Sequence, residues 1–194
     1  MRELDSSKKN FYKILDNILN KRRNKLNSDV EPVINIIKDV KKNGDKALLK
    51  YEKKFNKNNV LIPTKKKISK SINLLDKKVK KAIDLAFNRI FKFHSFQKFK
   101  NIRYTDKFNN KIEYKYYPID SVAIYVPGSS ASYPSSVLMN AIPAMVAGVK
   151  RIVMINPNYL GKLNPAVLYA ARKCKIKEIY SIGGPSAIAA LAYG

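Results

Sequence analysis

The order of segments in the second half of the chain is the feature that most constrains the fold. Three short apolar runs each lead into a segment with a helical pattern. The apolar runs cover residues 121–126, 151–155 and 178–182, and the helical patterns cover 133–147, 164–173 and 184–192. Strands that alternate with helices in this way predict a parallel sheet with crossover helices. We therefore expect an α/β fold, with a parallel-sheet, Rossmann-like domain over residues 119–194.

Residues 1–118 differ from the second half in their hydrophobic pattern, which is mostly that of amphipathic helices. Helices are predicted over residues 6–23, from a capping pattern at 28–31 to Gly44, over 45–55, and over 76–98 with Asp76 as N-cap. Short strands are predicted at 60–62 and 111–117. We expect a mostly helical N-terminal segment that is part of a second, incomplete α/β domain.

The chain carries 39 Lys and Arg against 14 Asp and Glu, a net charge of +25. Such a balance is typical of nucleic-acid-binding proteins. The basic residues are mostly lysines spread over every polar face, whereas modules that recognise base sequence tend to concentrate arginine. We favour compositional drift toward lysine as the explanation and expect no nucleic-acid partner.

Other compositional features concern the cellular compartment. No run of about 18 apolar residues is present, so we expect no membrane span. The polar N-terminus does not have the form of a secretory signal. Cys174 is the single cysteine, which excludes an internal disulfide. Together these features predict a cytoplasmic protein.

Two turns are candidates for a binding site because each follows an apolar strand and opens a helix. One covers residues 127–133 and the other residues 183–186. Ligands of open α/β sheets bind at the carboxyl ends of the strands, and a helix N-terminus there favours an anion. Neither turn matches the dinucleotide pattern GxGxxG or a phosphate loop. A nucleotide pocket and two tight turns that simply require glycine both remain open.

Specific strings of residues stand in and around these turns. They are Tyr-Val-Pro-Gly at 125–128, Tyr-Pro-Ser-Ser-Val-Leu-Met-Asn-Ala-Ile-Pro-Ala at 133–144, Val-Ala-Gly-Val at 146–149, Ile-Tyr-Ser-Ile-Gly-Gly at 179–184 and Ala-Ile-Ala-Ala-Leu-Ala-Tyr-Gly at 187–194. With these strings the chain resembles the histidinol dehydrogenase family. The resemblance covers about residues 29–194 and is most specific from 121 to 148.

The resemblance implies an enzyme that oxidises L-histidinol to L-histidine, the last steps of histidine biosynthesis, with two molecules of NAD. It also implies zinc as a cofactor and a homodimer in which the C-terminal tail of the partner completes each active site. By resemblance, Tyr125 contacts NAD and the turn of Pro127 and Gly128 lies beneath the cofactor. Ser186 occupies the position of a glutamine that contacts NAD in the family, and Ser135 is placed on the substrate side.

The chain departs from the family pattern in both turns. Ser129 stands where the family usually has a second glycine, and a Cβ there restricts backbone approach. Pro185 and Ser186 stand where Ala-Gln is common, and serine has a shorter reach than glutamine. Because the surrounding sequence keeps the family pattern, we interpret both changes as variation between lineages.

The zinc ligands and the catalytic Glu-His pair of the family lie later in its sequence than the segment matched here. This chain has one histidine, His94, and one cysteine, both interpreted as packing residues. We therefore predict no catalytic and no metal-ligating residue in the chain, and a fragment that is inactive by itself. Two alternatives remain: a non-catalytic relative that binds a nucleotide or a partner, and a basic nucleic-acid-binding protein.

Overall fold

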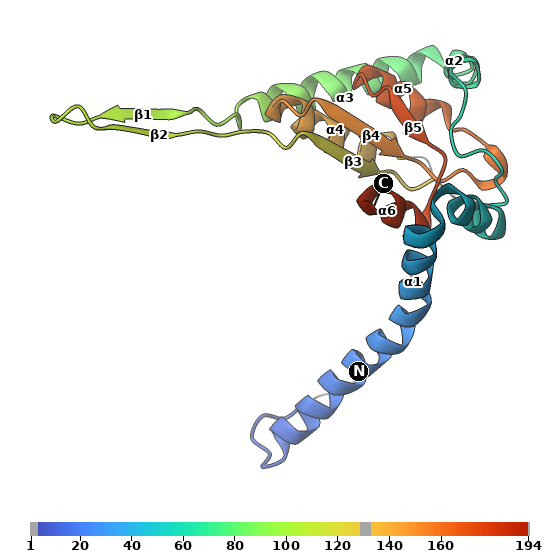
Figure 1. Ribbon diagram of the computed structural model, residues 1–194, viewed down its shortest axis with the longest axis vertical. Helices are drawn as coiled ribbons and strands as arrows, with labels where there is room; N and C mark the ends of the chain where they lie inside the picture. Colours follow the sequence, from blue (N-terminus) through green and yellow to red (C-terminus); the bar gives the residue numbers. More distant parts are fainter. Residues whose placement is uncertain (1–3, 129–132, 194) are drawn as a thin grey trace.

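The computed structural model describes residues 4–128 and 133–193, and helices lie on both faces of a central sheet (Figure 1). The helices are α1 (Phe11–Asn56), α2 (Lys65–Asn73), α3 (Lys77–Ser95), α4 (Pro134–Ala147), α5 (Pro165–Lys173) and α6 (Gly184–Tyr193), with a 3-10 turn at Tyr159–Gly161. The strands are β1 (Ile102–Thr105), β2 (Lys111–Tyr114), β3 (Ser121–Tyr125), β4 (Arg151–Ile155) and β5 (Glu178–Tyr180).

The sheet of the second half is parallel, with the order β3-β4-β5. Its register places Tyr125 beside Ile155, and Ile155 beside Tyr180, so the three strands end at the same level. This confirms the predicted α/β class and parallel sheet. Asn164 caps α5 through its side chain as its position suggested, and Gly148 ends α4 in the left-handed conformation.

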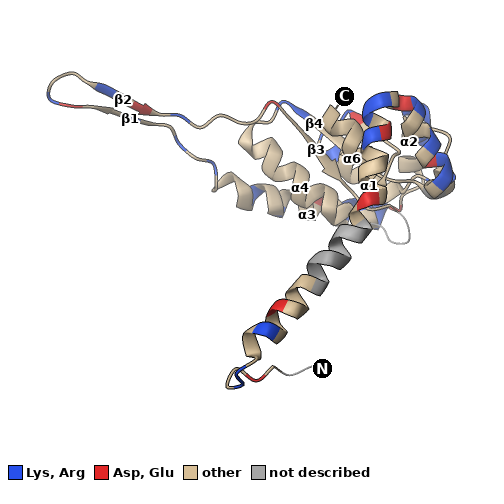
Figure 2. Ribbon diagram, turned by 60° about the horizontal axis from the view of Figure 1, so that its bottom comes forward, with Lys and Arg blue, Asp and Glu red and all other residues tan. Residues whose placement is uncertain are grey.

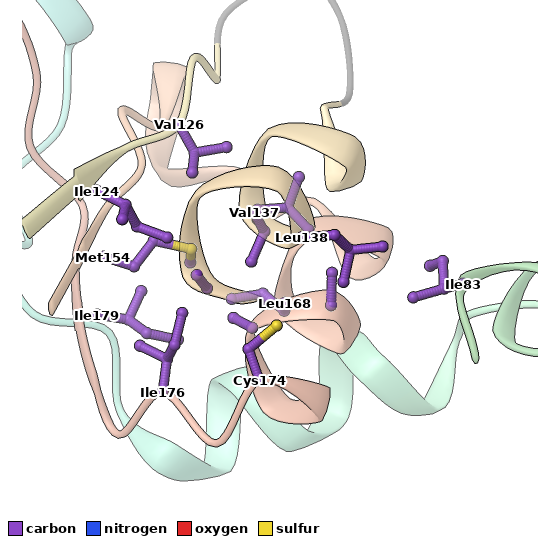
Figure 3. Packing of buried hydrophobic residues seen from close by; sticks show 14 of the residues in the cluster. Ile83, Ile124, Val126, Val137, Leu138, Met154, Leu168, Cys174, Ile176 and Ile179 are labelled. Carbon is purple, nitrogen blue, oxygen red and sulfur yellow. The ribbon is translucent and has the colours of Figure 1, made fainter. Parts of the chain in front are cut away.

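Each face of the sheet has its own apolar core because side chains alternate along a strand. Ile124 and Met154 point to the face covered by α3, α4 and α5, where they pack with Leu168 in the larger cluster (Figure 3). Ile155 points to the opposite face and packs with Leu48 of α1 and with residues at the start of α6. Residues before 118 thus contribute to both layers around the sheet.

The predicted division of the first helical region is wrong in one place, because α1 runs through the capping pattern at 28–31 without a break. The apolar positions before and after that pattern share one helical phase: Leu15 and Val33 are five turns apart. Continuation of the helix along its apolar face is therefore favoured over a new helix start at the capping pattern. Gly44 does interrupt the helix, with φ of 52° and ψ of −134°, at the position expected for its end.

Two smaller differences lie between α1 and α3. The predicted strand at 60–62 is absent, and Leu61 makes a single backbone hydrogen bond, accepting from the Ser181 N–H at 2.7 Å. Pro63 follows directly and cannot donate to a ladder, which leaves the segment too short to pair. Helix α2 lies where no element was expected, and Thr64 caps it through its side chain.

Strands β1 and β2 form an antiparallel hairpin that projects from the body as an arm (Figure 1). The predicted strand at 111–117 forms only as far as Tyr114, and β1 was not expected. Cross-strand partners share a face. One face of the arm carries Arg103 paired with Glu113, and Thr105 opposite Lys111. The other is wholly apolar and consists of Ile102, Tyr104, Ile112 and Tyr114, all exposed.

Basic residues are distributed over several elements, including α2, α3 and the arm (Figure 2). Within the part of the chain that the structure describes, no helix is long and apolar enough to cross a membrane.

Candidate functional site

The carboxyl ends of β3, β4 and β5 meet at one edge of the sheet, and both candidate turns lie there. Tyr125, the last residue of β3, reaches across the end of β4 to the turn after β5. Its hydroxyl accepts a hydrogen bond from the Gly184 N–H at 3.0 Å. The side chain remains 39% exposed. The contact places the end of β3 beside the turn after β5 at one edge of the sheet, as the parallel topology requires.

Both turns pack against Pro157, which follows the central strand. A Cβ added to Gly183 would lie 2.5 Å from the Pro157 Cγ, and one added to Gly128 would overlap the Pro157 carbonyl oxygen. Neither glycine has a positive φ. Glycine is therefore required at both positions by close approach to Pro157, which sets how the turns sit relative to each other.

The segment after β4 also holds the turns through two buried asparagines. The Asn156 amide donates to the Val126 carbonyl at 3.0 Å, at the end of β3. The Asn158 amide lies 2.7 Å from the Ser181 hydroxyl, just after β5. Sequence reasoning did not select these residues, although the string Asn-Pro-Asn directly after a buried strand was a usable signal.

The turn at 183–186 is also fixed by hydrogen bonds from residues at and just after the end of α1. The Glu52 carboxylate accepts from the Gly183 N–H at 2.7 Å, and burial raises its pKa above the usual glutamate range. The Asn58 amide donates to the Ser181 carbonyl at 2.9 Å. No sequence signal pointed to Glu52, because its partner lies 131 residues away.

The remaining predicted site residues occupy different environments. Ser186 is buried, and its hydroxyl donates to the Gly183 carbonyl at 3.1 Å, so it supports the turn from within. Ser135 is exposed in the first turn of α4, and Pro127 is exposed immediately before Gly128. Ser129 lies outside the described residues.

The two helix N-termini at this edge differ in their hydrogen bonding. At the start of α6, the N–H groups of Gly183 and Gly184 are engaged by Glu52 and Tyr125. At the start of α4, Tyr133 is the N-cap residue and makes no side-chain capping bond. The edge therefore presents the half-exposed Tyr125 ring and the partly exposed first turn of α4 to a ligand.

The single thiol of the chain and the potential metal ligands of the described residues give no reactive cluster at this edge. Cys174 lies in the core, where burial raises the pKa of its thiol to about 12, so it is a packing residue as expected. Within residues 4–128 and 133–193, no three His, Cys, Asp or Glu side chains cluster as metal ligands would.

His94 lies in the last turn of α3. This end of the helix leads into the arm (Figure 1). The His94 Nδ1 is 2.6 Å from the Gln97 Oε1. The residue lines a cavity of about 300 Å³ together with Phe99, Tyr116 and Pro143. His94 is half-buried, and its hydrogen bond is local.

The comparisons with known proteins agree on one group of enzymes. A family model described as histidinol dehydrogenase matches residues 19–194. Histidinol dehydrogenase of Pelagibacter ubique is 73% identical over 98% of this chain and 45% of that protein. The Gluconobacter oxydans enzyme is 40% identical over 100% of this chain and 46% of its own length.

Among solved structures, the crystal structure of histidinol dehydrogenase from Elizabethkingia anophelis matches 84% of this chain and 38% of its own chain. The TM-score is 0.79 and the sequence identity is 37%. This chain thus spans less than half the length of the relatives that it matches.

Proposed function

The chain belongs to the histidinol dehydrogenase family, and we propose that its sheet edge forms part of the NAD site of an enzyme that oxidises L-histidinol to L-histidine. The hydrogen bond from the Gly184 N–H to the Tyr125 hydroxyl supports this proposal most directly. It joins the end of β3 to the turn after β5, across the edge of the sheet where α/β folds bind ligands.

NAD would supply the hydride acceptor, and this chain would bind and orient it. The exposed Tyr125 ring offers a flat surface for stacking, while its hydroxyl stays fixed to the turn. Gly128 holds the first turn against Pro157, so that this turn would lie beneath the cofactor, and Pro127 lies exposed beside it. Ser186 would act by holding the Gly183 carbonyl, and Ser135 would lie on the substrate side.

Zinc, which the family implies, does not fit the residues that the structure describes, because they contain no cluster of metal-ligating side chains. We therefore assign no step through zinc to these residues. Their proposed role is confined to binding and orienting NAD.

We also infer a homodimer in the cytoplasm, without a nucleic-acid or membrane partner. Support for self-association comes from the apolar face of the arm, whose four side chains are 58–62% exposed. Contiguous apolar surface of this kind marks protein interfaces in many folds. A single cysteine is consistent with a reducing compartment.

The binding of NAD to the 194-residue protein tests the proposed site. Tyr125→Ala removes both the ring and the hydroxyl, and we expect it to raise the dissociation constant for NAD several-fold, measured by calorimetry. Tyr117→Ala is the matched control, because that tyrosine is 79% exposed near the arm. Equal affinities for the wild type and Tyr125→Ala would contradict the assignment.

A further inference from the structure

Glu52 is the one charged side chain that is buried among the described residues, with 1% of its surface exposed. None of the ion pairs in the described part of the chain includes it. Removing a carboxylate from water without a cation beside it is costly unless hydrogen bonds replace its hydration. The bonds that Glu52 makes must therefore compensate for its burial.

Those bonds connect two distant parts of the chain. Oε1 accepts from the Gly183 N–H at 2.7 Å, and Oε2 accepts from the Asn56 amide at 2.8 Å. Asn56 is the last residue of α1, whereas Gly183 lies between β5 and α6. Glu52 thus ties the end of α1 to the turn at the edge of the sheet.

Two groups hold this turn from separate elements. Glu52 of α1 takes the Gly183 N–H, and Tyr125 of β3 takes the Gly184 N–H. With both donors engaged, the orientation of two successive peptide groups is defined relative to the sheet. If Glu52 could not reach the turn, a buried N–H would lose its partner or the turn would move.

We propose that Glu52 is a positioning residue for the cofactor, holding the turn of Gly183 and Gly184 where NAD binds. The proposal rests on the proposed function of this edge. Position 52 requires a side chain long enough to bring an acceptor oxygen to the Gly183 N–H. The effect of a substitution on NAD binding therefore depends on side-chain length more than on charge.

Two substitutions separate reach from charge. Glu52→Gln keeps the length and an acceptor oxygen but removes the charge, whereas Glu52→Asp keeps the charge and shortens the side chain by one methylene. We expect Glu52→Asp to weaken NAD binding about fivefold, as loss of one hydrogen bond would. The glutamine variant should stay close to the wild type.

A spectroscopic readout tests the contact without NAD. The chain has seven glycines, so labelling with ¹⁵N-glycine gives a short list of amide signals. A hydrogen bond to a carboxylate is short and charge-assisted and shifts the amide proton downfield. The Gly183 signal should therefore move upfield in both variants, while the dispersion of the other glycine signals shows that the chain is folded.

Asp76→Ala serves as the stability control, because it removes the N-cap of α3 and leaves the turn untouched. We expect a lower unfolding temperature in this variant with unchanged NAD affinity. An unmoved Gly183 signal in Glu52→Asp, or wild-type NAD affinity in that variant, would overturn the proposal. If NAD shifts neither Gly183 nor Gly184 in the wild type, the proposed cofactor site itself fails.

Discussion

At the scale of single residues, the close approach of Gly128 and Gly183 to Pro157 sets the relative position of the two turns of the candidate site. The positions of Tyr125 and the two glycine turns followed from the sequence, because parallel strands bring their carboxyl ends to one edge. The contacts of Pro157 and Glu52 could not be predicted from the sequence. These contacts join segments that are far apart in sequence and form only in the packed fold.

Gly128→Ala tests the requirement for close approach. The added Cβ would overlap the Pro157 carbonyl oxygen, which is backbone and cannot move aside easily. We expect a loss of about 1–3 kcal/mol in the free energy of unfolding, as for overpacking of a rigid site. Urea denaturation measures it.

Gly44→Ala is the control for this prediction, because Gly44 has a positive φ but no atom within 4 Å of the added Cβ. Its cost should come from backbone strain alone, about 1–3 kcal/mol, because a φ of 52° with a ψ of −134° is a conformation that side-chain-bearing residues avoid. Unchanged stability in Gly128→Ala would show that the turn relaxes away from Pro157.

At the scale of elements, local patterns predicted the second half of the chain better than the first. The strands and helices after residue 119 have short apolar runs, proline at helix starts and glycine at a helix end, and they formed close to the expected bounds. In the first half, α1 continues through the capping pattern at 28–31. The segment at 60–62, closed by Pro63, accepts one backbone hydrogen bond from Ser181 but is too short to form a strand.

The arm was predicted least completely from the sequence, because β1 was not expected and β2 is shorter than expected. Its apolar face leads to a prediction about self-association. An isolated two-stranded hairpin is marginally stable in water unless another surface covers it. If a second copy of the chain covers this face, Tyr104→Lys combined with Ile112→Lys should convert the dimer to a monomer, since the two residues are cross-strand neighbours. Sedimentation velocity measures the change.

Thr105→Lys provides the control for the arm, because it adds a charge to the opposite face. Self-association should survive in this variant. A wild-type chain that is monomeric at every concentration, or a dimer that persists in the double variant, would contradict the prediction.

At the scale of the whole molecule, binding and chemistry are expected to be separate. The chain has one histidine and one cysteine in total, and both are engaged elsewhere: His94 with Gln97, and Cys174 in the core. Zinc sites in proteins take several such ligands. We therefore predict that the purified 194-residue protein binds NAD but neither retains zinc nor reduces NAD in the presence of L-histidinol. Absorbance of NADH and metal analysis of the purified protein measure the two outcomes, with a complete histidinol dehydrogenase as the positive control. Turnover by a preparation free of host enzyme, with stoichiometric zinc, would show that residues of this chain carry the chemistry after all.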